Sequence, residues 1–185
     1  MARLSEEQYR SFGTQILPEL FLTSSYEAKD AAWLKKHRIT HLVSVAEECP
    51  PSSALALKSL HIPLRDSPRT DVASHFAEVF DFIDAGRNSA CGAVLVHCFE
   101  GKNRSAAFVI GYLMQKEKCN LHQALSRVKS VRSFVEMNIG FHKQLLDLEH
   151  SLSFSGPSVP LNAEACHDLL EMDVITPDEI NKYCD

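Results

Sequence analysis

The sequence lacks the long apolar segments and the regular cysteine spacing that mark several large protein classes. No apolar run approaches the roughly 20 residues of a membrane-spanning helix, and residues 1–7 contain no hydrophobic region of a signal peptide. The six cysteines follow neither a disulfide framework nor the paired spacing of a zinc site. We therefore expect no membrane association and no bound metal. We also expect the protein to be in the cytoplasm, with the nucleus as a second location.

Basic residues are also fewer than acidic ones. The 185 residues include 19 Lys and Arg against 24 Asp and Glu, which gives a formal net charge of -5. Residues 161–185 hold seven acidic side chains and one lysine, so the first 160 residues are nearly neutral. Because nucleic-acid binding requires a basic patch or stripe, we expect no nucleic-acid partner.

Strand and helix patterns alternate along the first 150 residues, and an apolar share of 45% is enough for a hydrophobic core. The predicted strands lie at 16–22 (two strands around a turn), 41–46, 56–62 and 93–97, and the predicted helices at 26–37, 71–86, 104–118, 120–131 and 139–151. A Ser- and Pro-rich linker at 151–160 then separates a domain at 1–150 from an acidic, partly helical C-terminal appendage at 161–185.

The most informative stretch joins the strand at 93–97 to the helix at 104–118. It reads His97-Cys98-Phe99-Glu100-Gly101-Lys102-Asn103-Arg104-Ser105. A short loop that enters a helix directs backbone N–H groups at one centre, and the helix dipole adds positive charge there. Gly101 permits the sharp bend, and Arg104 offers a planar fork to two phosphate oxygens. Cys98 is expected to have a pKa below the free value of about 8.5 and to attack phosphorus.

The motif His97-Cys98-x5-Arg104-Ser105 resembles the signature of cysteine-dependent protein phosphatases. The small atypical dual-specificity phosphatases are the most similar group, over most of Leu17 to Leu148. The resemblance implies a protein tyrosine phosphatase-like α/β fold, with a central mixed sheet of four to five strands flanked by helices on both faces. It also implies catalysis without metal or cofactor, since the loop and Arg104 neutralise the phosphoryl group. The alternative is a buried structural cysteine beside a chance arginine.

The resemblance also assigns the acid and the supporting residues. Asp66 matches the general acid, which protonates the leaving group, and Asp71 is its rival. Because Asp71 directly precedes a helix pattern, we expect it to be a helix cap. Ser105 would hydrogen-bond the departing sulfur, while His97 would order the loop from behind and help to keep Cys98 ionised.

The same resemblance gives the phosphate-binding and bracing residues. The predicted phosphate-binding set is Phe99, Glu100, Gly101, Lys102, Asn103 and Arg104. Asn138 belongs to a segment that braces the phosphate loop in the family, although Met137 replaces the usual proline. Cys49 follows the strand at 41–46 and is either a free structural cysteine or a resolving thiol that forms a reversible disulfide with oxidised Cys98.

These residues predict a protein phosphatase that hydrolyses phosphotyrosine and phosphoserine/threonine through a cysteinyl-phosphate intermediate. One alternative is the same chemistry on a non-protein phosphate, such as an RNA 5′-phosphate, a phosphoinositide or a glucan. Another is a phosphoprotein-binding module without catalysis. The expected partners are phosphoprotein substrates, with a protein kinase as one candidate, and the expected assembly is a monomer or weak dimer.

Overall fold

A mixed five-stranded sheet forms the centre of the computed structural model, which describes residues 13–53, 56–90 and 92–152. The strands are β1 (Thr14–Leu17), β2 (Leu20–Thr23), β3 (Ile39–Ser44), β4 (Lys58–His61) and β5 (Ala93–His97). Their order is β1-β2-β5-β3-β4, with β1 antiparallel to β2 and the other neighbours parallel. The predicted α/β class and mixed sheet are therefore confirmed, with β4 at one edge.

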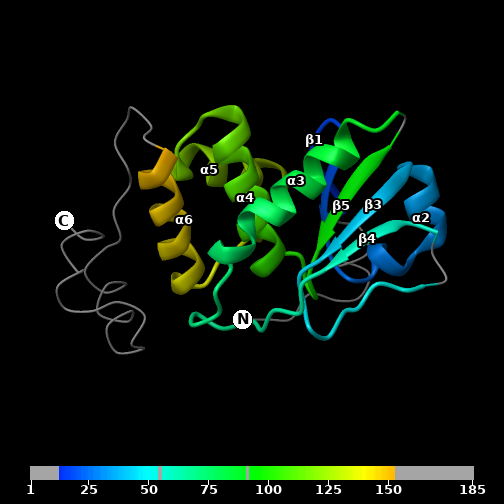
Figure 1. Cartoon of the computed structure of the whole chain (residues 1–185), viewed down its shortest axis with the longest axis horizontal. Coiled ribbons are helices and arrows are strands. Elements are labelled where there is room, and N and C mark those ends of the chain that lie inside the picture. The colour runs from blue at the N-terminus through cyan, green and yellow to red at the C-terminus, as the bar shows by residue number, and fades with distance from the viewer. Residues whose placement is uncertain (1–12, 54–55, 91, 153–185) are drawn as a thin grey trace.

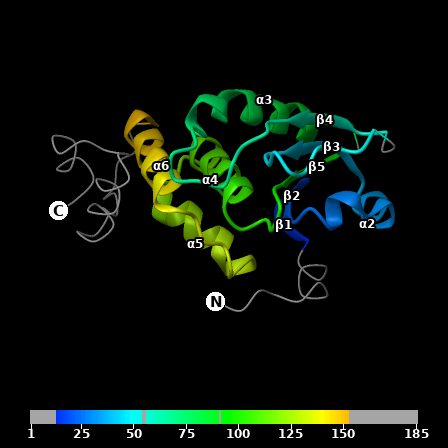
Figure 2. The same ribbon diagram turned by 90° about the horizontal axis from the view of Figure 1, so that it is seen from below.

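Helices cover both faces of this sheet. The helical elements are η1 (Glu27–Lys29), α2 (Ala31–Lys36), η2 (Ala73–His75), α3 (Phe76–Arg87), α4 (Arg104–Glu117), α5 (Leu121–Val131) and α6 (Ile139–Leu152). Figures 1 and 2 show α2 by itself at one side, while α3 to α6 gather at the other. Both faces of the sheet are covered because parallel strands joined by helical crossovers are buried on both sides.

The side chains of β5 show how one strand serves two cores. Val94 and Val96 pack into the larger core with α3 to α6, whereas Ala93 and Leu95 pack into the smaller core beneath α2. Alternate residues of a strand point to opposite faces, so an all-apolar strand indicates burial on both. β5 thus lies in the middle of the sheet, and the loop that follows it begins from a rigid base.

Helix α4 is the central helix of the larger core. Its residues from Arg104 to Met114 are all buried, and it packs against α3, α5, α6 and β5. The unbroken apolar run after Arg104 predicted such a helix, because a helix that is apolar all round must be covered on every side. The N-terminus of α4 is therefore held in place directly after the loop from β5.

The predicted helix over 26–37 is wrong as a single element. The chain forms the short η1, becomes extended at Asp30 and then starts α2. The Asp30 carboxylate accepts hydrogen bonds from the N–H groups of Ala32 and Trp33, at 2.9 and 3.1 Å. This side-chain cap starts a new helix at Ala31, and the pattern of alanines in the sequence did not reveal the interruption.

Most of the C-terminal predictions concern residues from 153 onward, which lie outside the described part of the chain. The appendage at 161–185 and nearly all of the linker at 151–160 therefore stay predictions, and α6 ends at Leu152. Across the stretches that the structure describes, none of the helices has both the length and the apolar character to cross a membrane.

Replacing Asn120 with alanine is expected to destabilise the protein by about 1 kcal/mol. Asn120 is the N-cap of α5, where it forms a capping box with Gln123, with bonds of 2.9 and 3.0 Å. Urea denaturation of the wild-type chain and Asn120→Ala would measure the difference in the free energy of unfolding. Equal midpoints would show that the capping box contributes nothing.

Candidate active site

Cys98 lies immediately after β5 and before the N-terminus of α4. Its side chain is buried, and its sulfur accepts two hydrogen bonds. The backbone N–H of Gly101 donates to Sγ at 3.2 Å, and the hydroxyl of Ser105 donates at 3.1 Å. Both donors are placed to stabilise negative charge on the sulfur, as is the positive end of the α4 dipole.

The loop from Cys98 to Asn103, which we call the phosphate loop, has every carbonyl group engaged by a donor. The donors and acceptors are His97 Nδ1 to Cys98 O, Ser25 N to Phe99 O, Arg132 Nη2 to Glu100 O, Arg132 Nε to Gly101 O, Glu136 N to Lys102 O, and Ala107 N to Asn103 O. With the carbonyls bound by surrounding elements, the N–H of Gly101 points toward the sulfur. A loop whose N–H groups converge in this way is an anion-binding nest.

Gly101 makes the bend in this loop, as the sequence predicted. Its φ is +70°, in the left-handed region that glycine adopts without steric cost. A Cβ at this position would lie 2.2 Å from the carbonyl oxygen of Thr23 and 2.5 Å from Arg132 Nη2. Both the backbone conformation and the lack of space therefore require glycine.

Arg104 has its guanidinium fixed by hydrogen bonds at one end, while its Nε faces the Asp66 carboxylate at 3.4 Å. Nη1 donates to Glu48 Oε2 at 2.8 Å and to the Leu64 carbonyl at 3.0 Å, and Nη2 donates to Glu48 Oε1 at 2.6 Å. Three of its five N–H bonds are thus used, and the others, on Nε and Nη2, lie along one edge. Nε is buried and has no hydrogen-bond partner among the described residues. This edge has the geometry to bind two oxygens of a phosphate.

The charge state of Arg104 follows from the same contacts. Burial favours the neutral form, but the hydrogen bonds to Glu48 and the charges of Cys98 and Asp66 outweigh it and raise the pKa of Arg104. The hydrogen bonds from Arg104 in turn lower the pKa of Glu48. Arg104 and Glu48 therefore form a charged pair at neutral pH.

Asp66 reaches the phosphate loop from a separate segment. Its Oδ1 accepts a hydrogen bond of 2.5 Å from Asn103 Nδ2, and its Oδ2 lies 3.4 Å from Arg104 Nε. Its rival Asp71 instead accepts a hydrogen bond from the N–H of Ser74, which lowers the pKa of Asp71. The structure thus brings Asp66, and not Asp71, to the Nε edge of Arg104.

His97 is buried behind the phosphate loop and is neutral. Burial lowers the pKa of His97 to about 4, and Nδ1 lies 3.1 Å from the carbonyl of Cys98. Because a carbonyl only accepts, Nδ1 carries the proton. His97 therefore orders the loop, as predicted, but it places no positive charge beside the sulfur.

The side chains of Lys102 and Phe99 lie at the rim of the phosphate loop, and the predicted role of their backbone N–H groups stays a prediction. The Lys102 ammonium lies 3.8 Å from Glu100 and 3.7 Å from Glu136, so carboxylates on both sides offset its charge. The Phe99 side chain is exposed at the rim, and its carbonyl accepts from Ser25 N–H at 3.0 Å.

Asn138 contacts the phosphate loop through its main chain instead of its side chain. Its N–H donates to Asn103 Oδ1 at 2.9 Å, while its own Oδ1 accepts from the N–H of Phe141 at 3.0 Å. The side chain thus caps the first turn of α6. The bracing predicted for Asn138 exists, but Asn103 supplies the side chain for it.

Sequence reasoning missed Arg132, the residue that supports the phosphate loop from below. Its side chain is almost completely buried, and Nε donates to Gly101 O at 2.7 Å. Burial lowers the pKa of Arg132 to about 10, although the charges of Glu27 and Cys98 act to raise it. Arg132 is therefore still a cation at neutral pH. An arginine at the end of an amphipathic helix ordinarily faces solvent, so no pattern in the sequence pointed to this role.

Glu48 was also missed, for a different reason. It is half-exposed and lies between a glutamate and a cysteine, in a stretch typical of a solvated loop. Only the fold brings it to Arg104, which is 56 positions away in the chain.

Cys49 is buried beside these residues. Burial raises the pKa of the Cys49 thiol, and its carbonyl accepts a hydrogen bond of 2.5 Å from Ser44. These contacts favour the structural interpretation, because a raised pKa makes a thiol a slow nucleophile. A disulfide with oxidised Cys98 stays a hypothesis.

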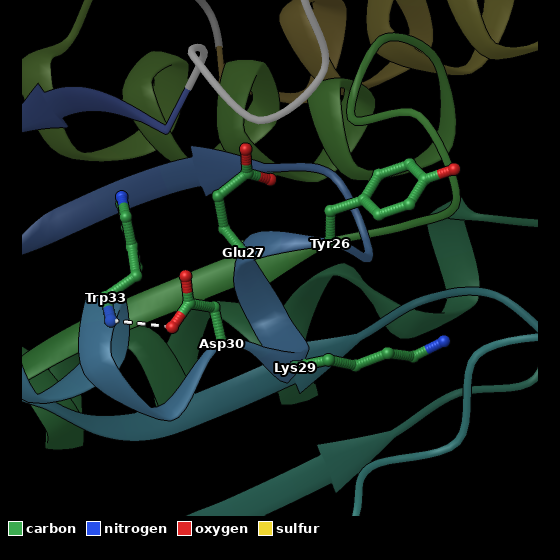
Figure 3. Close-up of a pocket in the computed structure, with 5 residues that line it drawn as sticks. All are labelled: Tyr26, Glu27, Lys29, Asp30 and Trp33. Carbon is green, nitrogen blue, oxygen red and sulfur yellow. Dashed lines mark hydrogen bonds between the residues drawn. The ribbon is translucent and has the colours of Figure 1, made fainter. Parts of the chain in front are cut away.

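A separate hollow lies on η1 and α2. Figure 3 shows it lined by Tyr26, Glu27, Lys29, Asp30 and Trp33, and its volume is about 380 Å³. None of the predicted site residues lines it. Within the described ranges, no group of three or more His, Cys, Asp or Glu side chains is arranged to hold a metal ion.

A buried cysteine that accepts a hydrogen bond from a loop amide, between a central strand and a helix that begins with a buried arginine, is typical of the cysteine-dependent phosphatases. The family model described as "Dual specificity phosphatase, catalytic domain" matches residues 20–151. The chain therefore belongs to the dual specificity phosphatase catalytic domain family.

Among curated proteins, human dual specificity protein phosphatase 5 is 37% identical over 175 residues, which cover 92% of this chain and 45% of that protein. Dual specificity protein phosphatase 1 of Arabidopsis thaliana is 39% identical over 136 residues, 74% of this chain and 68% of its own length. The chain thus spans about half the length of the first of these relatives.

Solved structures show the same fold. The crystal structure of human DUSP28 matches with a TM-score of 0.72 and 32% identity, covering 76% of this chain and 94% of that one. The human tyrosine phosphatase-like serine/threonine/tyrosine-interacting protein matches with a TM-score of 0.71 and 31% identity, covering 75% and 96%.

Gly101→Ala is expected to destabilise the protein by about 1–3 kcal/mol, because alanine is strained at positive φ. Contact with Thr23 and Arg132 adds to this cost. Urea denaturation of the wild-type chain and the variant measures the difference, and an unchanged midpoint would contradict the strain at Gly101.

The stability of the protein is expected to fall as the pH drops from about 6.5 to about 4. The His97 imidazole has its ordinary pKa of 6.5 in the unfolded chain and about 4 in the folded one, so the unfolded state binds more protons in this window. The loss reaches about 3 kcal/mol at the acid end and vanishes above the window. Denaturation at pH 7 and pH 5 checks this, and His97→Asn should show a smaller pH dependence. An unchanged dependence in the variant would assign the effect to other groups.

Proposed function

We propose that this protein is a protein phosphatase that hydrolyses phosphotyrosine and phosphoserine/threonine through a cysteinyl-phosphate intermediate. The observation that carries the proposal is the buried Nε of Arg104, which makes no hydrogen bond among the described residues and faces Asp66, together with a cysteine sulfur that already accepts two hydrogen bonds. A phosphate on the Nε edge of Arg104 presents its phosphorus to the sulfur, and the amides of the phosphate loop bind its other oxygens.

The first step transfers the phosphoryl group to the enzyme. The Cys98 thiolate attacks phosphorus, so an S–P bond forms while the bond to the leaving oxygen breaks. Asp66, at the Nε edge of Arg104, donates a proton to that oxygen. The guanidinium and the loop amides stabilise the charge on the equatorial oxygens.

The second step returns the enzyme to its starting state. Asp66, now a carboxylate, removes a proton from water, which attacks phosphorus as the S–P bond breaks. The Ser105 hydroxyl, 3.1 Å from Sγ, stabilises the departing thiolate. Neither step needs a metal ion, since the positive charge comes from Arg104, the helix dipole and the amides.

The charges around the phosphate loop favour a protein substrate over a phosphoinositide. Lys102 is paired with Glu100 and Glu136, so the rim offers little uncompensated positive charge for a polyphosphorylated ring. The relatives named dual specificity protein phosphatases support the same substrate class. The location in the cytoplasm or nucleus and the monomeric or weakly dimeric state remain part of this proposal.

A phosphoprotein-binding module is the second candidate, because one structural neighbour is named an interacting protein. A fold does not decide between catalysis and binding; the site does. In this chain Arg104 contacts Asp66, and the charge of Cys98 helps to raise the pKa of Arg104, whereas binding alone requires no nucleophile.

Cys98→Ser is expected to lower the turnover of an aryl phosphate by a factor on the order of 10⁴ to 10⁶, because the nucleophile is lost. The same variant should still bind a phosphotyrosine peptide, since Arg104 and the loop amides are intact. Steady-state kinetics and calorimetric titration measure the two effects. Peptide binding by a wild-type chain without turnover would favour the binding module, and unchanged turnover in the variant would refute the nucleophile assignment.

A further inference from the structure

Asn103 occupies a helix N-cap position but does not cap the helix. It directly precedes α4, and its side chain makes no hydrogen bond to the first turn of that helix. Asparagine is favoured at this position because its side-chain oxygen ordinarily accepts from the N2 or N3 amide. At Asn120 and Asn138 of the same chain the side chain does cap. The side chain of Asn103, which is buried, is therefore directed to other partners.

These partners determine how the amide of Asn103 is oriented. One end faces the backbone N–H of Asn138, 2.9 Å away, which only donates, so this end is the oxygen. The other end faces Asp66 Oδ1 at 2.5 Å and is the NH₂ group. Asn103 thus connects the phosphate loop to the start of α6 on one side and to the carboxyl group of Asp66 on the other.

This contact decides which oxygen of Asp66 can carry a proton. Oδ1 accepts the hydrogen bond from Asn103, so a proton on Asp66 resides on Oδ2. Oδ2 lies 3.4 Å from Arg104 Nε, at the edge where the phosphate would bind. The amide therefore directs the acidic proton toward the position of the leaving group.

The rest of the Asp66 segment is anchored elsewhere. Residues 70–73 are held by Gln144 of α6, which donates to the Thr70 carbonyl and accepts from the N–H groups of Val72 and Ala73. The backbone of Gly140 lies so close to Pro68 that a Cβ would meet its carbonyl oxygen at 1.9 Å. The Asp66 side chain itself is 46% exposed, and Asn103 makes its one short hydrogen bond among the described residues, beside the longer ion pair with Arg104.

We propose that Asn103 is a positioning residue for the general acid: its side-chain amide holds Asp66 with Oδ2 aimed at the leaving oxygen. This inference rests on the proposed phosphatase function and adds a side-chain role to the phosphate-binding role of the Asn103 backbone. As the S–P bond forms and the P–O bond breaks, the proton on Oδ2 moves to the leaving oxygen, and the resulting Asp66 carboxylate keeps its hydrogen bond to Asn103.

The test compares kcat/KM for two aryl phosphates, because a poor leaving group requires the proton and a good one does not. Phenyl phosphate represents the first kind and 2,4-dinitrophenyl phosphate the second. Asn103→Ala is expected to lose about 10- to 100-fold on phenyl phosphate, part of the 10²–10⁴ that a general acid supplies, and less than about 3-fold on the dinitrophenyl ester. Asp66→Asn should show the same selectivity with a larger loss.

Asn120→Ala is the matched control, since it makes the same substitution at an N-cap that lies outside the site. It should lose stability without changing the ratio between the two substrates. An equal loss on both esters in Asn103→Ala, or no loss on either, would overturn the positioning role even in an active enzyme. A wild-type chain that hydrolyses neither ester would overturn the phosphatase proposal itself, and this inference with it.

Discussion

The orientation of the phosphate loop depends on one constraint, which is that each carbonyl from Cys98 to Asn103 is bound by a donor from a surrounding element. These donors come from His97 of β5, from the segment after β2, from α4, from Arg132 and from the chain that follows it. A loop with free carbonyls would turn some of them toward the sulfur and repel an anion. Because so many elements take part, the affinity of the site for phosphate is coupled to the integrity of the whole fold.

Two buried arginines lie next to this loop in different roles. Arg132 donates to its carbonyls, whereas Arg104 donates to Glu48 and Leu64 and keeps N–H bonds that a phosphate could accept. Burying a guanidinium is costly unless its hydrogen bonds are made, and each arginine satisfies most of them. The bonds that Arg104 does not make within the described protein are those that a phosphate would accept.

The acid and the nucleophile lie on different segments, and side-chain amides connect them. Asn103 joins the phosphate loop to Asp66, and Gln144 joins the chain after Asp66 to α6. Asp66, the proposed proton donor, is thus held against the phosphate loop. Because Asn103 also binds the start of α6, and Gln144 of α6 binds the chain after Asp66, the position of Asp66 depends on the packing of α6.

The sequence by itself determined the strand, the loop and the central helix, because local patterns dictate them: a β-prone run, a glycine that alone tolerates φ of +70°, and an apolar run after Arg104. It also favoured Asp66 over Asp71 as the acid, through the resemblance; Asp71 accepts a bond from the N–H of Ser74 but is the N-cap of neither η2 nor α3. Only the tertiary structure decided the partners of these residues. Glu48, Arg132 and the side chain of Asn103 act across chain separations of 56, 31 and 37 residues, and no local pattern encodes which distant segments the packing of sheet and helices brings together.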